Sequence, residues 1–331
     1  MSHLFFVLAL FAGSFTATPL PPVTAAADRG ASESTAVPAL LPVPTDPRYR
    51  LTDLPFGEML VYRGRVVKAG MNFDVGRATL RAMRDDEGRP TLEARAQGAK
   101  FGYELNTRIC STLEEGTLLP ALHEVAERGT ERRTKKLVFH AGGAEFLRLK
   151  HCRDENCADP AHQVKRAKMH GPIPWGAEQV HCDDRDCRHR EHYEWRSRLD
   201  HQFETPYFDL LSAIYLARQV EFSPDAEPLV IPIVNDTRRW DVQVRARNQK
   251  RIEVAAGTFD AVELILEPVP ASGLEEDEDA EFKGLFGLNG AIQIWVDRAT
   301  RRPLLIEGTL PFAFLELHAQ VELEKIETVA E

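Results

Sequence analysis

The sequence predicts a mainly β protein in which one antiparallel sheet dominates and a single helix packs against it. Apolar and polar residues alternate with a period of two from Met59 to Met83 and again from Arg238 to Leu323. This spacing is typical of strands with one buried and one solvated face. Only the segment at about 206–218 carries apolar residues at helical spacing instead. Many strands and one helix favour a sheet that is covered on one side.

The N-terminal half has the pattern of a β meander. Segments 58–70, 71–83 and 91–109 are short, contain β-branched residues and are interrupted by glycine, as consecutive antiparallel strands are. The segment LVFHAGGAEFLRLK, residues 137–150, has Gly142-Gly143 between two apolar runs. Glycine tolerates the positive φ of tight turns, so this segment is a predicted hairpin.

The predicted helix begins at Thr205-Pro206, because threonine can cap a helix and proline fits the first helical position. One apolar stripe then follows at helical spacing, formed by Leu210, Leu211, Ile214 and Ala217. Such a stripe is expected to face the sheet.

Further strands are predicted in the C-terminal half, within residues 240–247, 261–269 and 291–310. Gly257, between the first two, is expected in a tight turn with positive φ. The acidic run 275–281 places like charges side by side and lacks the ligand spacing of a calcium loop, so it favours a solvated loop.

The composition argues against nucleic acid as the main partner. The chain has 331 residues, 43% of them apolar, with a formal net charge of −10 and a pI near 5.6. Its length and apolar content suffice for a sizeable core. Binding to a phosphate backbone requires a basic face, which this charge balance does not favour.

The N-terminus predicts export. Residues 1–27 are expected to be a signal peptide, because the apolar run MSHLFFVLALFAGSFTA is short for a membrane span and three alanines follow it at 25–27. An uncleaved anchor is the alternative, since the run is preceded by no Lys or Arg. Residues 28–48 are a predicted flexible linker. No later stretch is apolar enough to span a membrane, so a soluble periplasmic or secreted protein is expected.

Four stretches resemble the DUF3108 family of exported bacterial proteins of unknown function. They are LPFGEMLVYRGRVVKAGM (54–71), the helical run 208–218, VAAGTFDAVEL (254–264) and GAIQIWVDRATRRPLLIEG (290–308). The resemblance implies a DUF3108-like β domain over 49–328, with a curved sheet or half-barrel and a helix in its concavity. Such half-barrels are similar to those of periplasmic lipoprotein carriers and lipid-handling proteins. The family supplies no recognised catalytic residues, and residues 151–195 look like an insertion.

The insertion contains the pattern H-C-x4-C-x4-H twice, starting at His151 and at His181. One hypothesis is a structural zinc site formed by Cys152, Cys157, Cys182 and Cys187, with His162 or His192 as alternative ligands. The other is two disulfides, which suit an oxidising compartment and leave Cys110 unpaired. Disulfides do not require histidine at matched positions, which tips the balance slightly toward metal.

The two hypotheses predict opposite responses of the insertion. If zinc is bound, chelator or acid should loosen the insertion while the β domain stays folded, because thiolates must be deprotonated to bind metal. If disulfides are present, reductant should loosen the insertion and chelator should have no effect. Thiol counting and elemental analysis of one unreduced sample decide between them, and four blocked cysteines without metal would exclude zinc.

No enzyme motif is complete. The sequence HEVAE at His123 has Glu127 where a zinc-protease helix requires its second histidine, and the glycine-containing motifs of hydrolases, P-loop proteins and dinucleotide-binding proteins are absent. A metal-dependent hydrolase that uses His189, Glu191 and His192 is the remaining enzyme hypothesis, and it requires an open metal position.

The leading functional hypothesis is an exported, non-enzymatic β protein that binds an apolar or amphipathic ligand such as a lipid, or an envelope partner, in the concavity of its sheet. The candidate contacts are Tyr207, Phe208, Leu211, Ile214, Tyr215, Trp240 and Trp295. Ordinary packing of a helix on a sheet is the more common role of such side chains. The alternative is an envelope scaffold or assembly factor that docks a protein through a zinc-stabilised insertion.

Overall fold

The computed structural model of the chain describes most of the predicted β domain. The described residues are 54–68, 71–100, 103–130, 132–140, 143–150, 196–202, 206–236, 238–271, 282, 284–312 and 315–329. The predicted signal peptide, the linker, both Cys/His units and the acidic run 275–281 lie outside them.

A single antiparallel sheet of fourteen strands forms the body of the structure. Its strands are β1 (Glu58–Lys68), β2 (Met71–Arg84), β3 (Pro90–Lys100), β4 (Tyr103–Leu113), β5 (Pro120–Arg128), β6 (Arg132–His140), β7 (Gly143–Lys150), β8 (Arg196–Gln202), β9 (Leu229–Asn235), β10 (Arg238–Val254), β11 (Gly257–Pro270), β12 (Asn289–Asp297), β13 (Pro303–Phe312) and β14 (Leu315–Thr328). The predicted mainly β fold with one dominant antiparallel sheet is confirmed.

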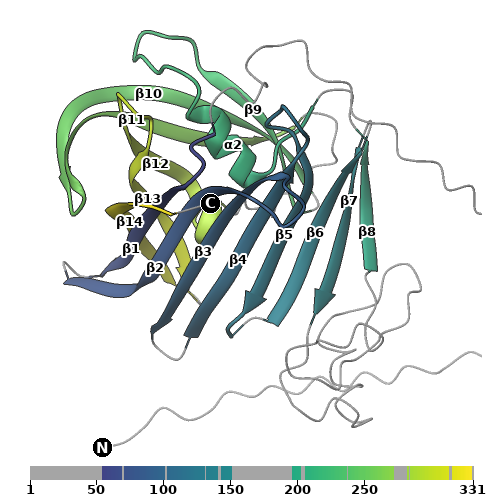
Figure 1. The fold of residues 1–331 in the computed structure, drawn as a ribbon. Helices are drawn as coiled ribbons and strands as arrows, with labels where there is room; N and C mark the ends of the chain where they lie inside the picture. Colours follow the sequence, from purple (N-terminus) through teal and green to yellow (C-terminus); the bar gives the residue numbers. More distant parts are fainter. Residues whose placement is uncertain are drawn as a thin grey trace, which may run out of the picture. The chain divides into compact units, whose positions relative to one another are not determined.

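The sheet is two meanders joined side by side. Strands β1 to β8 pair in chain order, β9 to β14 do the same, and the ladder between β1 and β14 connects the two series. Within the described strands no ladder joins β8 to β9, so the sheet is open. Register shifts such as those in β1 and β10 bend it. Figure 1 shows β9 to β14 curling around the helix.

Helix α2 (Leu210–Ala217) lies between β8 and β9 in the chain. It starts four residues later than predicted, because Asp209 rather than Thr205 caps it. The Asp209 carboxylate accepts hydrogen bonds from the backbone N–H groups of Leu211 and Ser212 at 2.7 and 2.9 Å. The Ser212 hydroxyl accepts a bond from the Asp209 N–H at 3.0 Å and completes a capping box.

The chain before the helix is extended instead of helical. The N–H of Phe208 donates to the carbonyl of Pro232, and the N–H of Val234 donates to the carbonyl of Phe208, both at 2.9 Å. These bonds align Phe208 with β9 (Leu229–Asn235) and fix where the helix enters the sheet. No helix among the described residues is long and apolar enough to cross a membrane.

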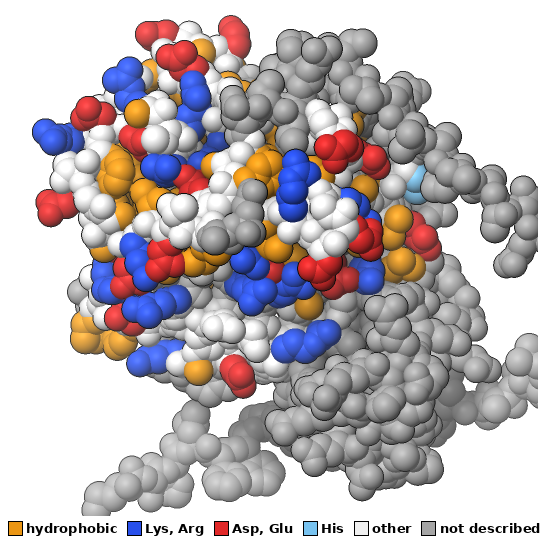
Figure 2. Space-filling view, in the orientation of Figure 1, with side chains coloured by type: hydrophobic (Ala, Val, Ile, Leu, Met, Phe, Trp, Pro, Cys, Tyr) orange, Lys and Arg blue, Asp and Glu red, His pale blue; other side chains and the backbone are white. Residues whose placement is uncertain are grey.

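Alternation along the strands separates a buried inner face from a charged outer one. Leu92, Ala94 and Ala96 of β3 are buried on the inner face, whereas Arg95, between Ala94 and Ala96, and Gln97, which follows Ala96, are exposed. On the face of the molecule shown in Figure 2, basic and acidic side chains lie close together, with hydrophobic side chains between them. The inner face and α2 share one core, and a smaller cluster formed by Leu137, Phe139, Ala144, Phe146, Tyr207 and Val234 accompanies it.

Both predicted turns between strands agree with the structure. His140 of β6 pairs with Gly143 of β7, as expected of the hairpin at 137–150. Gly257 pairs with Val254 across a two-residue connection and has φ +137°, which confirms the predicted positive φ.

Candidate functional site

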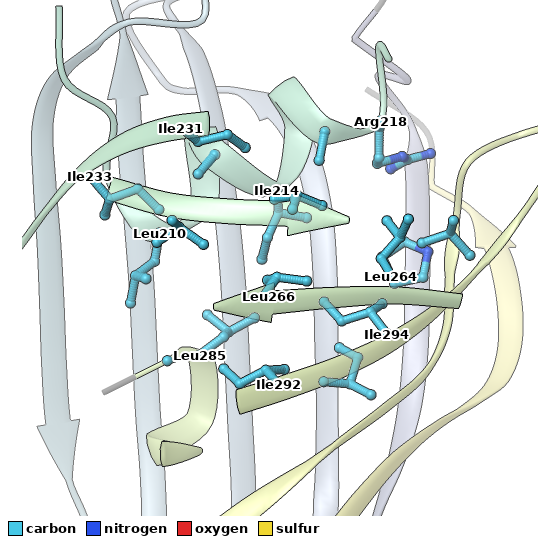
Figure 3. Close-up of a pocket in the computed structure, with 18 of the residues that line it drawn as sticks. Leu210, Ile214, Arg218, Ile231, Ile233, Leu264, Leu266, Leu285, Ile292 and Ile294 are labelled. Carbon is cyan, nitrogen blue, oxygen red and sulfur yellow. The ribbon is translucent and has the colours of Figure 1, made fainter. Parts of the chain in front are cut away.

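An apolar pocket of about 90 Å³ lies between α2 and the inner face of the C-terminal strands. Figure 3 shows leucine and isoleucine side chains from the helix and the strands pointing toward one another, with Arg218 at one end, away from Leu285. The pocket is lined by Leu210, Ala213, Ile214, Ala217, Arg218, Phe222, Ile231, Ile233, Val242, Val244, Leu264, Leu266, Phe282, Gly284, Leu285, Leu288, Ile292, Ile294, Val296, Arg301, Pro303 and Ile306.

Regular spacing produces this lining. Strand residues two apart share a face, so Ile292, Ile294 and Val296 of β12 all point inward, and the other strands contribute in the same way. Helix residues three or four positions apart also share a face, and those of α2 point into the pocket. At Gly284 an added Cβ would clash with Ile292, so a larger residue would enter the lining.

A second, polar cavity of about 340 Å³ adjoins the first. It is lined by Leu54, Pro55, Glu58, Tyr215, Arg218, Gln219, Thr300, Arg301 and Arg302. Arg218 and Arg301 line both cavities. An apolar and a basic compartment therefore meet at these two side chains.

Glu58 organises the polar cavity. Its Oε1 accepts a hydrogen bond from Arg218 Nη2 at 2.8 Å, and its Oε2 accepts one from Arg302 Nε at 2.5 Å. The side chains of Glu58 and Arg218 are 9% and 10% exposed. The Arg218 guanidinium also lies 5.2 Å from the centre of the Tyr215 ring. Even so, Arg218 Nη1 is buried without a hydrogen-bond partner among the described residues.

Two buried phenols stand close to these charges. Burial raises the pKa of both Tyr62 and Tyr215 well above the usual value of tyrosine, although nearby Arg218 acts in the opposite direction. Both phenols stay neutral at physiological pH. The Tyr62 hydroxyl donates a hydrogen bond of 3.0 Å to the carbonyl of Pro303, which ties β1 to the start of β13.

The connection between β12 and β13 carries two of the arginines. The Asp297 carboxylate accepts a hydrogen bond of 2.9 Å from the Thr300 N–H, and the Asp297 carbonyl accepts one of 2.8 Å from the Arg301 N–H. This tight turn places Arg301 in the left-handed region, with φ +55°. Residues other than glycine rarely adopt that conformation.

Ser111, His123 and Asp209 form a buried polar group beneath the helix start. The Ser111 hydroxyl lies 2.9 Å from His123 Nδ1, and Asp209 Oδ1 lies 3.4 Å from the same nitrogen. A catalytic triad needs the serine and the acid on opposite nitrogens of the ring. Both groups here converge on one nitrogen and are buried, so the arrangement anchors the helix to β4 and β5.

The structure distributes the predicted contact residues over several environments. Ile214 lines the apolar pocket and Tyr215 the polar cavity. Phe208 and Leu211 are fully buried in the core. Tyr207 belongs to the smaller cluster, apart from both cavities.

The two predicted tryptophans are also separate. Trp240 is buried with its ring 5.4 Å from that of Phe282, in an edge-to-face arrangement. Trp295 alternates with the pocket residues Ile294 and Val296, so it occupies the opposite face of the sheet. There the Lys250 ammonium lies 4.4 Å from the centre of its ring.

Sequence reasoning missed the arginines and Glu58. A signal was present, because Arg218 directly follows the apolar stripe of the helix and Arg301-Arg302 close a turn between two strands. The pattern did not reveal that these positions meet.

The described residues contain no group of three or more His, Cys, Asp or Glu side chains that could hold a metal ion. The proposed zinc ligands lie outside this part of the chain. Cys110 is a free, half-buried thiol on β4, and burial raises its pKa to about 11.

Comparison with known proteins gives a family match over part of the chain. The family model DUF3108, described as a protein of unknown function, matches residues 163–318. This segment is a DUF3108 match. It confirms the resemblance for the stretches 208–218, 254–264 and 290–308, whereas 54–71 lies outside the match. The matched segment contains every residue that lines the apolar pocket. The polar cavity adds Leu54, Pro55 and Glu58 from outside it.

Two solved structures are similar at low identity. One is a protein of Parabacteroides distasonis inferred to be a lipoprotein, with 10% identity and a TM-score of 0.27. The other is a protein of Bacteroides fragilis inferred to be exported and to have a YmcC-like fold, with 9% identity and the same TM-score of 0.27. Each alignment covers 84% of this chain and 99% of the other. No curated protein matches the sequence significantly.

Proposed function

We propose that this protein binds an apolar or amphipathic ligand in the pocket beneath α2 and that it acts without catalysis in the cell envelope after export. The observation that carries the proposal is the pocket itself, whose lining is apolar except for Arg218 and Arg301. Ligand sites are typically concave and mostly apolar, with a few polar groups that orient the ligand.

The pocket's size fits one narrow apolar group. Its volume of about 90 Å³ exceeds several times the roughly 10–15 Å³ that one water needs. Apolar cavities of this kind stay dry and accept apolar guests. Each methylene group that moves from water into such a site contributes about 0.8 kcal/mol. A single alkyl chain therefore suits the pocket better than a ring system.

The end of the helix lies beside the pocket. Helix α2 is only eight residues long and is held at its start by the Asp209 cap, whereas its last residue, Ala217, lines the pocket beside Arg218. In this proposal the alkyl chain of the ligand lies along the pocket, and one end of the ligand lies near Arg218. The protein's partners in this proposal are lipids or proteins of the cell envelope.

Filling the pocket should abolish binding. Ala217→Phe places a ring into the apolar lining, and we expect at least tenfold weaker binding of decanol, a probe with a single alkyl chain, in a calorimetric titration. Val230→Phe adds the same ring on β9 at a position that is 51% exposed and outside the lining. This control should bind the probe like the wild type.

Circular dichroism must first show that both variants are folded. Equal affinity of folded Ala217→Phe and wild-type protein would contradict the proposed site. A polypeptide that copurifies in place of a small apolar molecule would favour the scaffold alternative instead.

A further inference from the structure

The apolar pocket and the polar cavity share two lining residues. Arg218 and Arg301 line both of them, so an alkyl chain that extends to this end of the apolar pocket brings its terminal group beside these two side chains. Figure 3 shows Arg218 at the end of the row of apolar side chains. A group at that end of the alkyl chain therefore lies next to side chains that also line the polar cavity.

The basic end has the charge to hold an anion. The charged residues that line it are Arg218, Arg301, Arg302 and Glu58. Two positive charges remain after the Glu58 carboxylate is counted against them. This excess occurs in a protein whose formal net charge is −10, and low exposure of Arg218 and Glu58 limits its screening by solvent.

Arg218 has donor capacity that the protein leaves unused. Glu58 occupies its Nη2, while its Nη1 is buried and unpaired among the described residues. A buried N–H without a partner is unfavourable, and guanidinium groups bind carboxylate or phosphate oxygens with two parallel bonds. The side chain is 90% buried, lines the cavity and has a free donor, as a ligand anchor would.

Arg301 provides a second, independent observation in favour of an anion site. Its φ of +55° is a strained conformation that glycine would adopt without cost. Its guanidinium forms no hydrogen bond or ion pair with any residue that the structure describes. The strained turn thus places Arg301, whose charge is unpaired among the described residues, where it lines both cavities.

From these observations we infer that the ligand is a single-chain amphiphile with an oxyanion head group, whose head lies between Arg218 and Arg301. The alkyl chain occupies the apolar pocket. Arg302, which is bonded to Glu58, adds its positive charge to the polar cavity. This inference rests on the proposed function and adds the chemistry of the head group to it. Carboxylate and phosphate share the recognition by guanidinium.

Decyl compounds with different heads test the inference by calorimetric titration below their micelle concentrations. Decyl phosphate should bind at least tenfold more tightly than decanol, and decyltrimethylammonium should bind more weakly than decanol. The preference of the protein for decyl phosphate over decanol should become smaller in high salt. Inorganic phosphate alone should bind at least a hundredfold more weakly than decyl phosphate, because it lacks the chain.

Arg301→Gly separates this recognition from folding. Glycine adopts positive φ without strain, so the melting temperature should stay the same or rise. Affinity for decyl phosphate should fall about tenfold while affinity for decanol stays unchanged. Arg298→Ala, an exposed arginine in the same turn that lines neither cavity, is the control and should alter neither affinity.

The outcomes distinguish two failures. Equal binding of decyl phosphate, decanol and decyltrimethylammonium, with no effect of Arg301→Gly, would overturn the inference and leave the proposed function standing. Binding of inorganic phosphate as tight as that of decyl phosphate would also overturn it. If none of the decyl compounds binds, the proposed function itself fails.

Discussion

Asp209→Ala should lower the free energy of unfolding by about 3 kcal/mol, because it removes both the cap of α2 and a buried acceptor. The carboxylate accepts the N–H groups of Leu211 and Ser212 and lies 3.4 Å from His123 Nδ1. Loss of the cap costs about 1–2 kcal/mol, and the donors left unpaired in a buried site cost about as much again. Urea denaturation at pH 7 measures the change.

The same residue should make stability depend on acid. Burial alone would raise the pKa of Asp209, but the charge of His123 and the surrounding hydrogen bonds outweigh it and lower the pKa. A lowered pKa means that the contribution of Asp209 is present above the pKa of the unfolded chain and is lost as the pH falls through the folded value. We therefore expect a loss of stability below about pH 4.

Asp209→Asn is the matched control for the cap. Asparagine caps a helix about as well as aspartate, so this variant should lose clearly less stability than Asp209→Ala and should lack the acid-dependent part. If alanine and asparagine destabilise the protein equally, the helix is not held by the capping bonds.

Glu93→Gln should lower the free energy of unfolding by about 2 kcal/mol at pH 7. Glu93 on β3 is buried on the outer side of the sheet and bonds Arg81, Arg95 and Arg108 at 2.6–2.9 Å. Removing its charge leaves three guanidinium groups without their common anion. The arginines are partly solvated, which keeps the expected effect below that of a fully buried ion pair.

Acid should remove the same contribution in the wild type. Burial would raise the pKa of Glu93, but hydrogen bonds from Arg95 and Arg108 and the charge of Arg81 lower it to about 2. The contribution is therefore complete above about pH 5 and is lost between the ordinary pKa of 4.5 and about 2. Urea denaturation at pH 6 and pH 3 should show a smaller difference for Glu93→Gln than for the wild type.

Glu87→Gln is the control for charge removal at a nearby exposed site. Glu87 is 71% exposed and pairs with Arg89 in the turn before β3, so its loss should change stability by less than about 0.5 kcal/mol. A Glu93→Gln variant as stable as the control would show that the arginine cluster contributes nothing to stability.

The sheet and the helix were predictable because both depend on short-range periodicity. A period of two identified the strands, and the apolar stripe identified α2. The start of the helix was wrong by four residues, because Thr205-Pro206 is a plausible cap and start. The better signal was Asp209 with Ser212 three positions later, which is the spacing of a capping box.

The candidate site was only partly predictable, because it depends on which distant segments meet. Glu58 lies 160 residues from Arg218 and 244 from Arg302 in the chain. The pairing of β1 with β14 joins the N-terminal and C-terminal meanders, and periodicity carries no information about that pairing. Trp295 illustrates a second limit, since large apolar residues occupy both faces of β12 and alternation alone does not tell which face is concave.

Native mass spectrometry tests the central claim most directly. The full-length chain is expressed with export to the periplasm of the host, purified without detergent and measured at low activation energy. We expect a bound species of a few hundred daltons in the wild type and in Val230→Phe, absent from Ala217→Phe and identified as a single-chain anionic amphiphile after release. A wild-type mass equal to that of the processed polypeptide alone, from every such preparation, would contradict a ligand in this pocket.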